Sequence, residues 1–270
     1  MINTSPELLV VVPYHNRQET IQRTTDSILS QTYGNFVLLI MDDASDVPAR
    51  DVVTSDPRIK FFEMEENVGR YFIDAVASRA NPYRYYMPHD SDDESVPERV
   101  EILKDRMDSC DDLDAVFNLE HRVGLDGTRT TMPLGSFHTP FSRERMTHRA
   151  HHSALYKNEV LLSTGGYHPG FRVSYDTFMV NVLKMTAKID IVEAPLYIRY
   201  KMEDSLTVSP TTGLDSPYRA QVREQLMVLY RECLDCPSQA KTIIEGSIAQ
   251  KTRARMISEI IRLKKEMNWF

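Results

Sequence analysis

The sequence predicts an α/β protein with a mainly parallel sheet flanked by helices and a C-terminal helical appendage. Short apolar runs alternate with segments of helical periodicity through about the first 110 residues, and such alternation requires crossover connections between parallel strands. From residue 217 onward the pattern is helical only, with amphipathic segments rich in Arg, Lys and Glu. We therefore expect a core of residues 1–210, with halves of about 7–120 and 121–210, and an appendage of 211–270.

The predicted strands of the first half are continuous apolar runs, which are typical of strands buried on both faces. These runs are ELLVVVP at 7–13, FVLLIM at 36–41, RIKFFEM at 58–64 and YRYYM at 83–87. Helical spacing of apolar residues predicts helices at 18–31, 46–55, 67–80 and 97–107.

After the apolar run at 113–123 the regular alternation breaks. Residues 122–152 have weak periodicity and predict loops or a meander. The segment ALYKNEVLLSTGG at 154–166 predicts a helix ended by its glycine pair, SYDTFMVNVLKMT at 174–186 a second helix, and KIDIVEAPLYIRY at 188–200 strand material. The appendage is expected to form helices over 218–234 and 242–267.

Charge and hydropathy exclude some classes of function. The chain has 32 Lys and Arg against 39 Asp and Glu, a formal charge of −7, which argues against a general nucleic-acid binder because counterion release needs a basic face. The N-terminal apolar run has only a few residues, too few for a membrane span or a signal peptide. We therefore expect a cytoplasmic location.

Polar residues follow three of the predicted strands. Asn16 and Arg17 follow the first strand, Asp42 and Asp43 end the second, and the acidic stretch that contains Asp90, Asp92 and Asp93 follows the fourth. In an open parallel sheet, ligands bind beyond the carboxyl ends of the strands. The sequence therefore predicts that these side chains share one rim of the sheet.

The acidic stretch admits two interpretations. Single carboxylates are favoured as helix N-caps. Several together are costly, since two unit charges 4 Å apart repel by about 1 kcal/mol in water and about 4 kcal/mol at a dielectric of 20. An all-oxygen cluster therefore predicts a hard cation, Mn²⁺ or Mg²⁺, which would also reverse the local field for a bound diphosphate.

Two segments carry a resemblance to a known family. VVVPYHNRQETIQRTTDSILSQTYGNFVLLIMDDASD at 10–46 and YRYYMPHDSDDESVPERVEIL at 83–103 resemble the nucleotide-binding half of the inverting family-two glycosyltransferases, which have a GT-A fold. The resemblance covers about residues 7–207. It implies a nucleotide-binding half at about 7–120 and an acceptor half at about 121–210.

The resemblance also implies roles for residues of the first half. Asp43 would contact the base of the nucleotide, with the turn of Pro13, Tyr14, Asn16 and Arg17 nearby. Asp90 and Asp92 would form the D-x-D pair, in which Asp92 binds the metal and Asp90 contacts ribose or metal-bound water. Arg70 falls where the family often has a basic residue near the nucleotide.

In the second half, STGGYHPGFRVSYDTFMVNVL at 163–183 resembles the family segment that carries the catalytic base. Aligned on the glycine pair, Asp176 takes the place of that base, and Tyr175 stands where Glu usually precedes it. The Arg and His run at 136–152 is a second candidate binding segment. Arg143, Arg145 and Arg149 could reach the diphosphate, and His151 or His152 could contact the donor or the acceptor. A solvated surface loop is the alternative interpretation of this run.

The resemblance implies a metal-dependent inverting transfer of a sugar from a nucleoside-diphosphate sugar, with a uridine nucleotide favoured, to a glycan, lipid-linked or small-molecule acceptor. A nucleotidyltransferase and a non-catalytic nucleotide-sugar-binding module of the same fold remain alternatives. For the C-terminal helices, a homodimer contact, a peripheral membrane contact and a plain solvated face all remain open.

Overall fold

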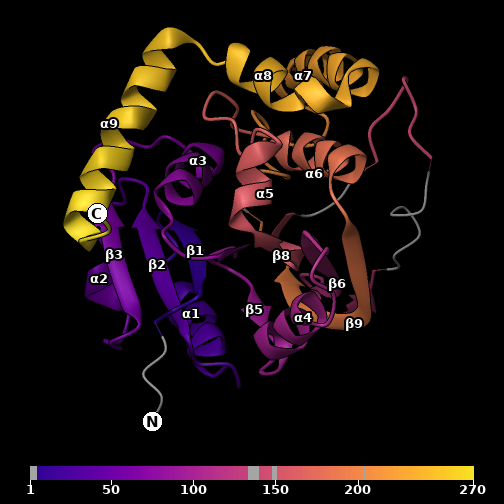
Figure 1. Ribbon diagram of the computed structural model, residues 1–270. Helices are drawn as coiled ribbons and strands as arrows, with labels where there is room; N and C mark the ends of the chain where they lie inside the picture. Colours follow the sequence, from indigo (N-terminus) through magenta and orange to yellow (C-terminus); the bar gives the residue numbers. More distant parts are fainter. Residues whose placement is uncertain (1–4, 133–139, 148–150, 204) are drawn as a thin grey trace.

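The computed structural model describes residues 5–132, 140–147, 151–203 and 205–270. Within them, one mixed sheet runs in the strand order β3-β2-β1-β4-β8-β6-β9-β5, and β7 pairs with β6 (Figure 1). The strands are β1 (Leu8–Tyr14), β2 (Phe36–Asp42), β3 (Ile59–Glu63), β4 (Tyr85–Pro88), β5 (Glu94–Ser95), β6 (Ala115–Val123), β7 (Arg129–Thr131), β8 (Ala154–Lys157) and β9 (Ile189–Tyr200).

Helices cover both faces of this sheet (Figure 1). They are α1 (Ile21–Leu29), α2 (Ala49–Val52), α3 (Arg70–Ala80), α4 (Arg99–Asp108), α5 (Asn158–Ser163), α6 (Tyr175–Thr186), α7 (Pro217–Asp235), α8 (Ala240–Gly246) and α9 (Gln250–Met267), with short 3₁₀ turns at His151–Ser153 and Pro237–Gln239.

The predicted fold class is confirmed. Strand β1 pairs in parallel with β2 and β4, β2 with β3, and β6 with β9, while β8, β5 and β7 pair antiparallel. The parallel register brings the carboxyl ends of β1, β2 and β4 to one edge of the sheet. The loops that leave these three strands therefore form a common rim.

Strand β1 has apolar side chains on both faces because helices cover both. Leu9 and Val11 belong to a core with α3, α5 and α6, whereas Leu8, Val10 and Val12 belong to a second core with α1 and α4. Since successive side chains of a strand point to opposite faces, burial on both sides yields the continuous apolar run seen in the sequence. Two packed layers thus hold the rim of the sheet in place.

One predicted helix is partly wrong. The helix expected at 154–166 begins only at Asn158, and the residues before it form the strand β8. All four residues of β8 are buried, between β4 and β6. A strand with no solvent face has no period-two alternation, so its pattern is not distinguishable from that of a buried helix. The two-residue strand β5, inside the acidic stretch, was also not predicted.

The C-terminal helices pack onto the sheet domain and share its core. Leu226 of α7, Ile244 of α8 and Leu263 of α9 belong to the same hydrophobic cluster as Leu9 of β1. Gly165, which has φ of +100°, lies so close to α8 that a Cβ atom there would be 2.8 Å from Ile244 Cδ1. The boundary at residue 210 stays a prediction. Among the described residues, no helix is both long and apolar enough to span a membrane.

We expect Leu263→Ala to lower the free energy of unfolding by about 2–5 kcal/mol, because it empties a buried site between α9 and the sheet domain. Ile261→Ala on the same helix is the control: its side chain is 57% exposed, and a change within about 0.5 kcal/mol is expected. Urea unfolding followed by circular dichroism measures both. Equal effects for the two variants would contradict the packing of α9 into the shared core.

Candidate functional site

Strained backbone marks the rim. Asn16 after β1 (φ of 49°), Ala44 after β2 (φ of 58°) and Ser174 two residues before Asp176 (φ of 65°) adopt left-handed conformations without being glycine. Such conformations are costly for alanine and serine and are concentrated at functional sites. Asn16 and Ala44 lie on the rim, and Ser174 lies in the segment that the resemblance assigns to the catalytic base.

The turn after β1 is bound to the loop after β2. The Asn16 side chain donates from Nδ2 to Asp46 (3.1 Å) and accepts from the Asp46 N–H (2.9 Å). Tyr14 is fully buried, and its hydroxyl donates to the Val47 carbonyl (3.1 Å). The buried Tyr14 therefore holds the loop after β2 through this hydrogen bond. Asn16 and Arg17 are partly exposed on the rim and line a cavity of about 430 Å³ together with Lys201.

Asp43 is held by the backbone at the start of α3. Its two carboxylate oxygens accept the N–H groups of Val68 (2.6 Å) and Gly69 (2.8 Å). Burial raises the pKa of Asp43, and these two hydrogen bonds oppose that rise. Its contact with a nucleotide base stays a prediction, and the Asp43 carboxylate is already oriented by two hydrogen bonds.

The acidic stretch is matched by cations and donors from neighbouring elements. Asp90 pairs with Arg70 of α3, and Glu94 pairs with Arg23 (3.0 Å). Asp93 is 1% exposed and accepts the N–H of Tyr200 (2.8 Å). Arg70 and Arg23 therefore compensate the charges of Asp90 and Glu94 within the protein.

Of the three carboxylates Asp90, Asp92 and Asp93, Asp92 has the weakest contacts with the protein. Its nearest cation is Arg17 Nε at 3.9 Å, and its side chain is 21% exposed. Oxygens of Asp90, Asp92 and Asp93 lie within 4.8 Å of one another. A group of three carboxylates, one of them weakly bound, is a donor set that fits Mn²⁺ or Mg²⁺.

Burial, and next the charge of Asp92, raises the pKa of Asp93 to about 6 from 3.8. A carboxyl group whose pKa is raised by folding stabilises the folded state fully when the pH is below the pKa of the unfolded chain. This stabilisation is lost as the pH rises through the pKa of the folded state, by at most about 1.4 kcal/mol per pH unit. The stability of metal-free protein relative to Asp93→Asn should therefore fall between pH 4 and pH 7. Asn keeps an acceptor for the Tyr200 N–H.

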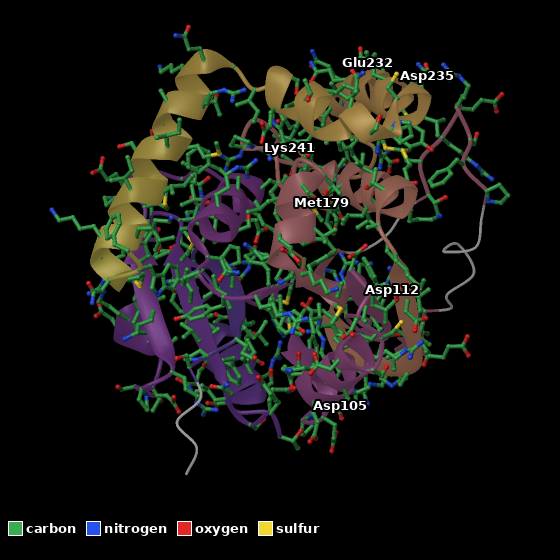
Figure 2. The ribbon with its side chains drawn as sticks, in the orientation of Figure 1. Asp105, Asp112, Met179, Glu232, Asp235 and Lys241 are labelled. Atoms are coloured by element: carbon green, nitrogen blue, oxygen red, sulfur yellow. The ribbon has the colours of Figure 1, made fainter. Side chains whose placement is uncertain are left out.

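Urea unfolding of chelator-treated protein across this pH range measures the difference. Asp105→Asn, at an exposed position of α4 (Figure 2), removes the same charge and should give no such trend. A pH-independent difference between wild type and Asp93→Asn would contradict the argument.

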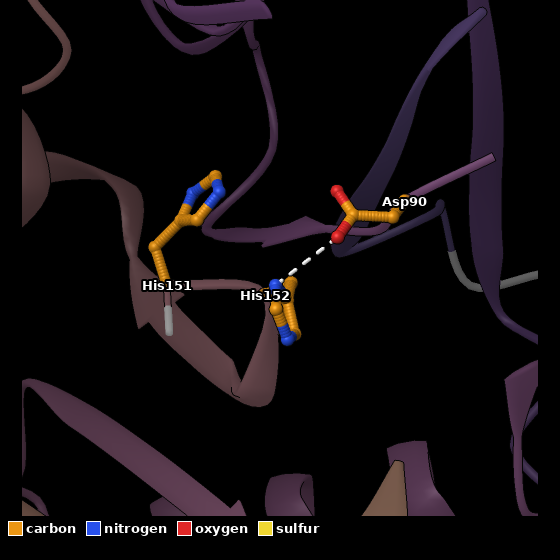
Figure 3. Close-up of side chains that lie close together, drawn as sticks. All are labelled: Asp90, His151 and His152. Carbon is orange, nitrogen blue, oxygen red and sulfur yellow. Dashed lines mark ion pairs between the residues drawn. The ribbon is translucent and has the colours of Figure 1, made fainter. Parts of the chain in front are cut away.

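His151 and His152 face Asp90 from the segment before β8 (Figure 3). His152 Nδ1 lies 3.2 Å from Asp90 Oδ2 and its Nε2 lies 3.1 Å from Glu120 Oε2, while its ring stacks on Tyr197. Burial lowers the pKa of His152 more than the contact with Glu120 raises it. A neutral imidazole has a single N–H, so one of the two contacts sets a ring lone pair against a carboxylate.

Asp176 lies in the first turn of α6. Its Oδ1 accepts the hydroxyl of Tyr71 (2.9 Å). The Tyr71 ring in turn meets the ring of His151, with centroids 6.0 Å apart. Burial, followed by the charge of Asp176, raises the pKa of Tyr71 well above 10, so the phenol stays a hydrogen-bond donor.

The arginines predicted to bind the nucleotide sugar lie in different parts of the structure. Arg70 is not a solvated helix residue, because it binds both Asp90 and Asp74. Arg143 pairs with Asp235, which Figure 2 labels on α7, and so lies against the C-terminal helices. Arg149 lies outside the described residues.

Sequence reasoning missed Glu120 and Tyr71. Glu120 is 6% exposed on β6 and binds both His152 and Arg122. Burial acts to raise its pKa, but the contact with His152 and the charges of Arg199 and Arg122 together lower it well below its usual value. Neither residue belongs to a local motif, so only its contacts identify it.

The site and the fold can now be compared with known proteins. The model of the family described as Glycosyl transferase family 2 matches residues 9–165, more than half of the chain. The chain belongs to glycosyl transferase family 2.

Individual relatives agree with this assignment. The hyaluronan synthase of Pasteurella multocida is 28% identical over 192 residues, which are 66% of this chain and 19% of that protein. The putative teichuronic acid biosynthesis glycosyltransferase TuaG of Bacillus subtilis is 30% identical over 151 residues, which are 53% of this chain and 56% of TuaG. The chain thus spans about a fifth of the length of the Pasteurella synthase.

Among solved structures, S. aureus TarS in complex with UDP-GlcNAc superposes with a TM-score of 0.58 at 15% identity, covering 94% of this chain and 79% of that one. The complex of TarS residues 1–349 with UDP gives the same TM-score at 13% identity. At this level of identity the likeness concerns the fold, and it confirms the expected GT-A architecture.

Proposed function

We propose that the protein is a metal-dependent inverting glycosyltransferase that moves a sugar from a nucleoside-diphosphate sugar to an acceptor hydroxyl. The observation that carries the proposal is the arrangement of carboxylates across the site. Asp90 and Asp92 follow β4 at the rim where ligands of such sheets bind, and Asp176 on α6 is connected to Asp90 through contacts of Tyr71 and His151.

In the proposed reaction, Asp176 takes the proton of the acceptor hydroxyl as general base. Tyr71 donates to Asp176 Oδ1 and so fixes the orientation of the carboxylate while Oδ2 remains for the acceptor. The attacking oxygen displaces the diphosphate in one step, with inversion at the anomeric carbon and without a covalent enzyme intermediate. General base catalysis of this kind contributes about 10²–10⁴ in rate.

Asp92, with Asp90, would hold the divalent cation, and a bound cation supplies positive charge to the departing diphosphate. Arg17, which lies 3.9 Å from Asp92, has its guanidinium beside the same position. Asn16 and Asp43 would bind the nucleoside at the neighbouring strand ends.

Names of relatives support the choice of substrates. One similar structure is a complex with UDP-GlcNAc, and similar proteins are named for hyaluronan, chondroitin and teichuronic acid synthesis. We accordingly propose a uridine-diphosphate sugar as donor and a growing glycan or a lipid-linked precursor as acceptor.

A homodimer contact or a peripheral membrane contact through α9 remains a proposal. Ile257 and Ile261 are exposed on that helix, one turn apart, with Lys265 exposed beyond them. Measurement of the oligomeric state in solution tests the homodimer contact, and vesicle binding tests the membrane contact.

Thermal unfolding with a panel of nucleoside-diphosphate sugars and Mn²⁺ tests the donor, because a ligand that binds only the folded state raises the apparent stability. A shift with uridine nucleotides that needs Mn²⁺ supports the proposal. Product analysis then tests transfer and anomeric configuration. Binding without transfer to any acceptor would favour the non-catalytic module, and retention of configuration would contradict the mechanism.

A further inference from the structure

The side chains of Asp90, His151 and His152 form a cluster whose ligand atoms all lie within 4.8 Å of one another (Figure 3). We call it the histidine cluster. Both histidines are 4% exposed. The cluster shares Asp90 with the acidic stretch but takes its other members from the segment that precedes β8, which the proposed reaction does not use.

Each histidine has one ring nitrogen bound on the outside of the cluster. His152 Nε2 contacts Glu120 Oε2 at 3.1 Å, and His151 Nδ1 contacts the Tyr167 hydroxyl at 2.8 Å. His151 Nε2 has no hydrogen-bond partner within the part of the chain that the structure describes. Histidines that bind metals commonly have this arrangement, in which an outer carboxylate or other polar group binds the second nitrogen and orients the ring.

The distance inside the cluster suits two ligands of one ion. His152 Nδ1 and Asp90 Oδ2 are 3.2 Å apart. Ligand bonds of about 2.0–2.2 Å at octahedral or tetrahedral angles separate neighbouring ligand atoms by about 2.8–3.6 Å. A cation between these atoms would also remove the unfavourable contact of a ring lone pair with a carboxylate.

We propose that the histidine cluster binds a divalent transition-metal ion, Zn²⁺ or Mn²⁺ in preference to Mg²⁺. Two imidazoles and one carboxylate are ligands for which the affinity order of transition metals applies, whereas Mg²⁺ prefers oxygen alone. The ring of His151 also contacts that of Tyr71, the hydrogen-bond donor to Asp176. Tyr71 therefore contacts both the histidine cluster and the proposed base.

Calorimetric titration of chelator-treated protein with Zn²⁺ and with Mg²⁺, in the absence of nucleotide, tests the proposal. Wild type is expected to bind one Zn²⁺ per chain at least about tenfold more tightly than Mg²⁺. His151→Gln, His152→Gln and the outer-contact variant Glu120→Gln should each weaken Zn²⁺ binding by about 10–100-fold.

Two controls separate this site from others. His121→Gln changes a histidine on β6 that contacts Thr131, and it should bind Zn²⁺ as wild type does. Asp92→Asn should lose nucleotide binding but retain Zn²⁺. Because the readout is the metal alone, the histidine cluster can fail while sugar transfer stands, and transfer can fail while the cluster binds metal.

Wild type loaded with one equivalent of Mn²⁺ gives a test that needs no variant. Pulsed electron paramagnetic resonance should detect coupling to imidazole nitrogen. Absence of that coupling, or Zn²⁺ affinity unchanged in both histidine variants, would overturn the proposal.

Discussion

Asp176→Asn is expected to lower kcat for sugar transfer by about 10²–10⁴ while leaving donor affinity unchanged. The amide oxygen of Asn can accept the Tyr71 hydroxyl as Asp176 Oδ1 does (2.9 Å), so the side chain should keep its place. Only its capacity to take a proton is lost. Initial rates with saturating donor and acceptor measure kcat, and calorimetry measures donor affinity separately.

Tyr71→Phe provides the companion measurement. It leaves the carboxylate intact and removes the hydrogen bond that orients it, so we expect a smaller loss of kcat than for Asp176→Asn. Transfer by Asp176→Asn at the wild-type rate would show that Asp176 is not the general base.

Asp92→Ala is expected to abolish the Mn²⁺-dependent part of nucleotide binding. With Mn²⁺ present, the Kd for UDP should rise by at least about 100-fold, equivalent to about 2.7 kcal/mol. Without Mn²⁺, variant and wild type should bind equally weakly. The fold should tolerate the change, because among the described residues the Asp92 carboxylate has one ion pair, with Arg17 at 3.9 Å.

Glu98→Ala is the matched control for this experiment, since it removes an exposed carboxylate from the same acidic stretch. Calorimetry with UDP, with and without Mn²⁺, should leave this variant indistinguishable from wild type. If Asp92→Ala bound UDP with Mn²⁺ as tightly as Glu98→Ala does, the role of Asp92 in holding the cation would be refuted.

Much of the fold was predictable because local pattern and burial agree. The runs that became β1 and β2 are apolar throughout, since both of their faces are covered. Parallel pairing then places whatever follows each strand on the same rim, so Asn16, Asp43 and Asp90 were predicted to be neighbours from their positions after strands.

Other features depended on contacts between distant segments. The sequence of β8 predicts the start of a helix, because its four residues are all buried and therefore lack the alternation typical of a strand. The charge balance of the acidic stretch was also hidden, since Asp90 meets Arg70 and His152 only after the chain folds.

From the sequence alone one obtains the order of strands and helices, the rim where they end, and the candidate carboxylates Asp92 and Asp176. Periodicity and position after strands reveal the elements and the rim, because both depend on residues close together in the chain, whereas the family resemblance implies the roles of Asp92 and Asp176. The tertiary structure alone decided that His151 and His152 lie beside Asp90, that Glu120 binds His152, and that Tyr71 orients Asp176. Hydrogen bonds and ion pairs of this kind depend on distances of about 3 Å between elements far apart in sequence, which no local pattern encodes.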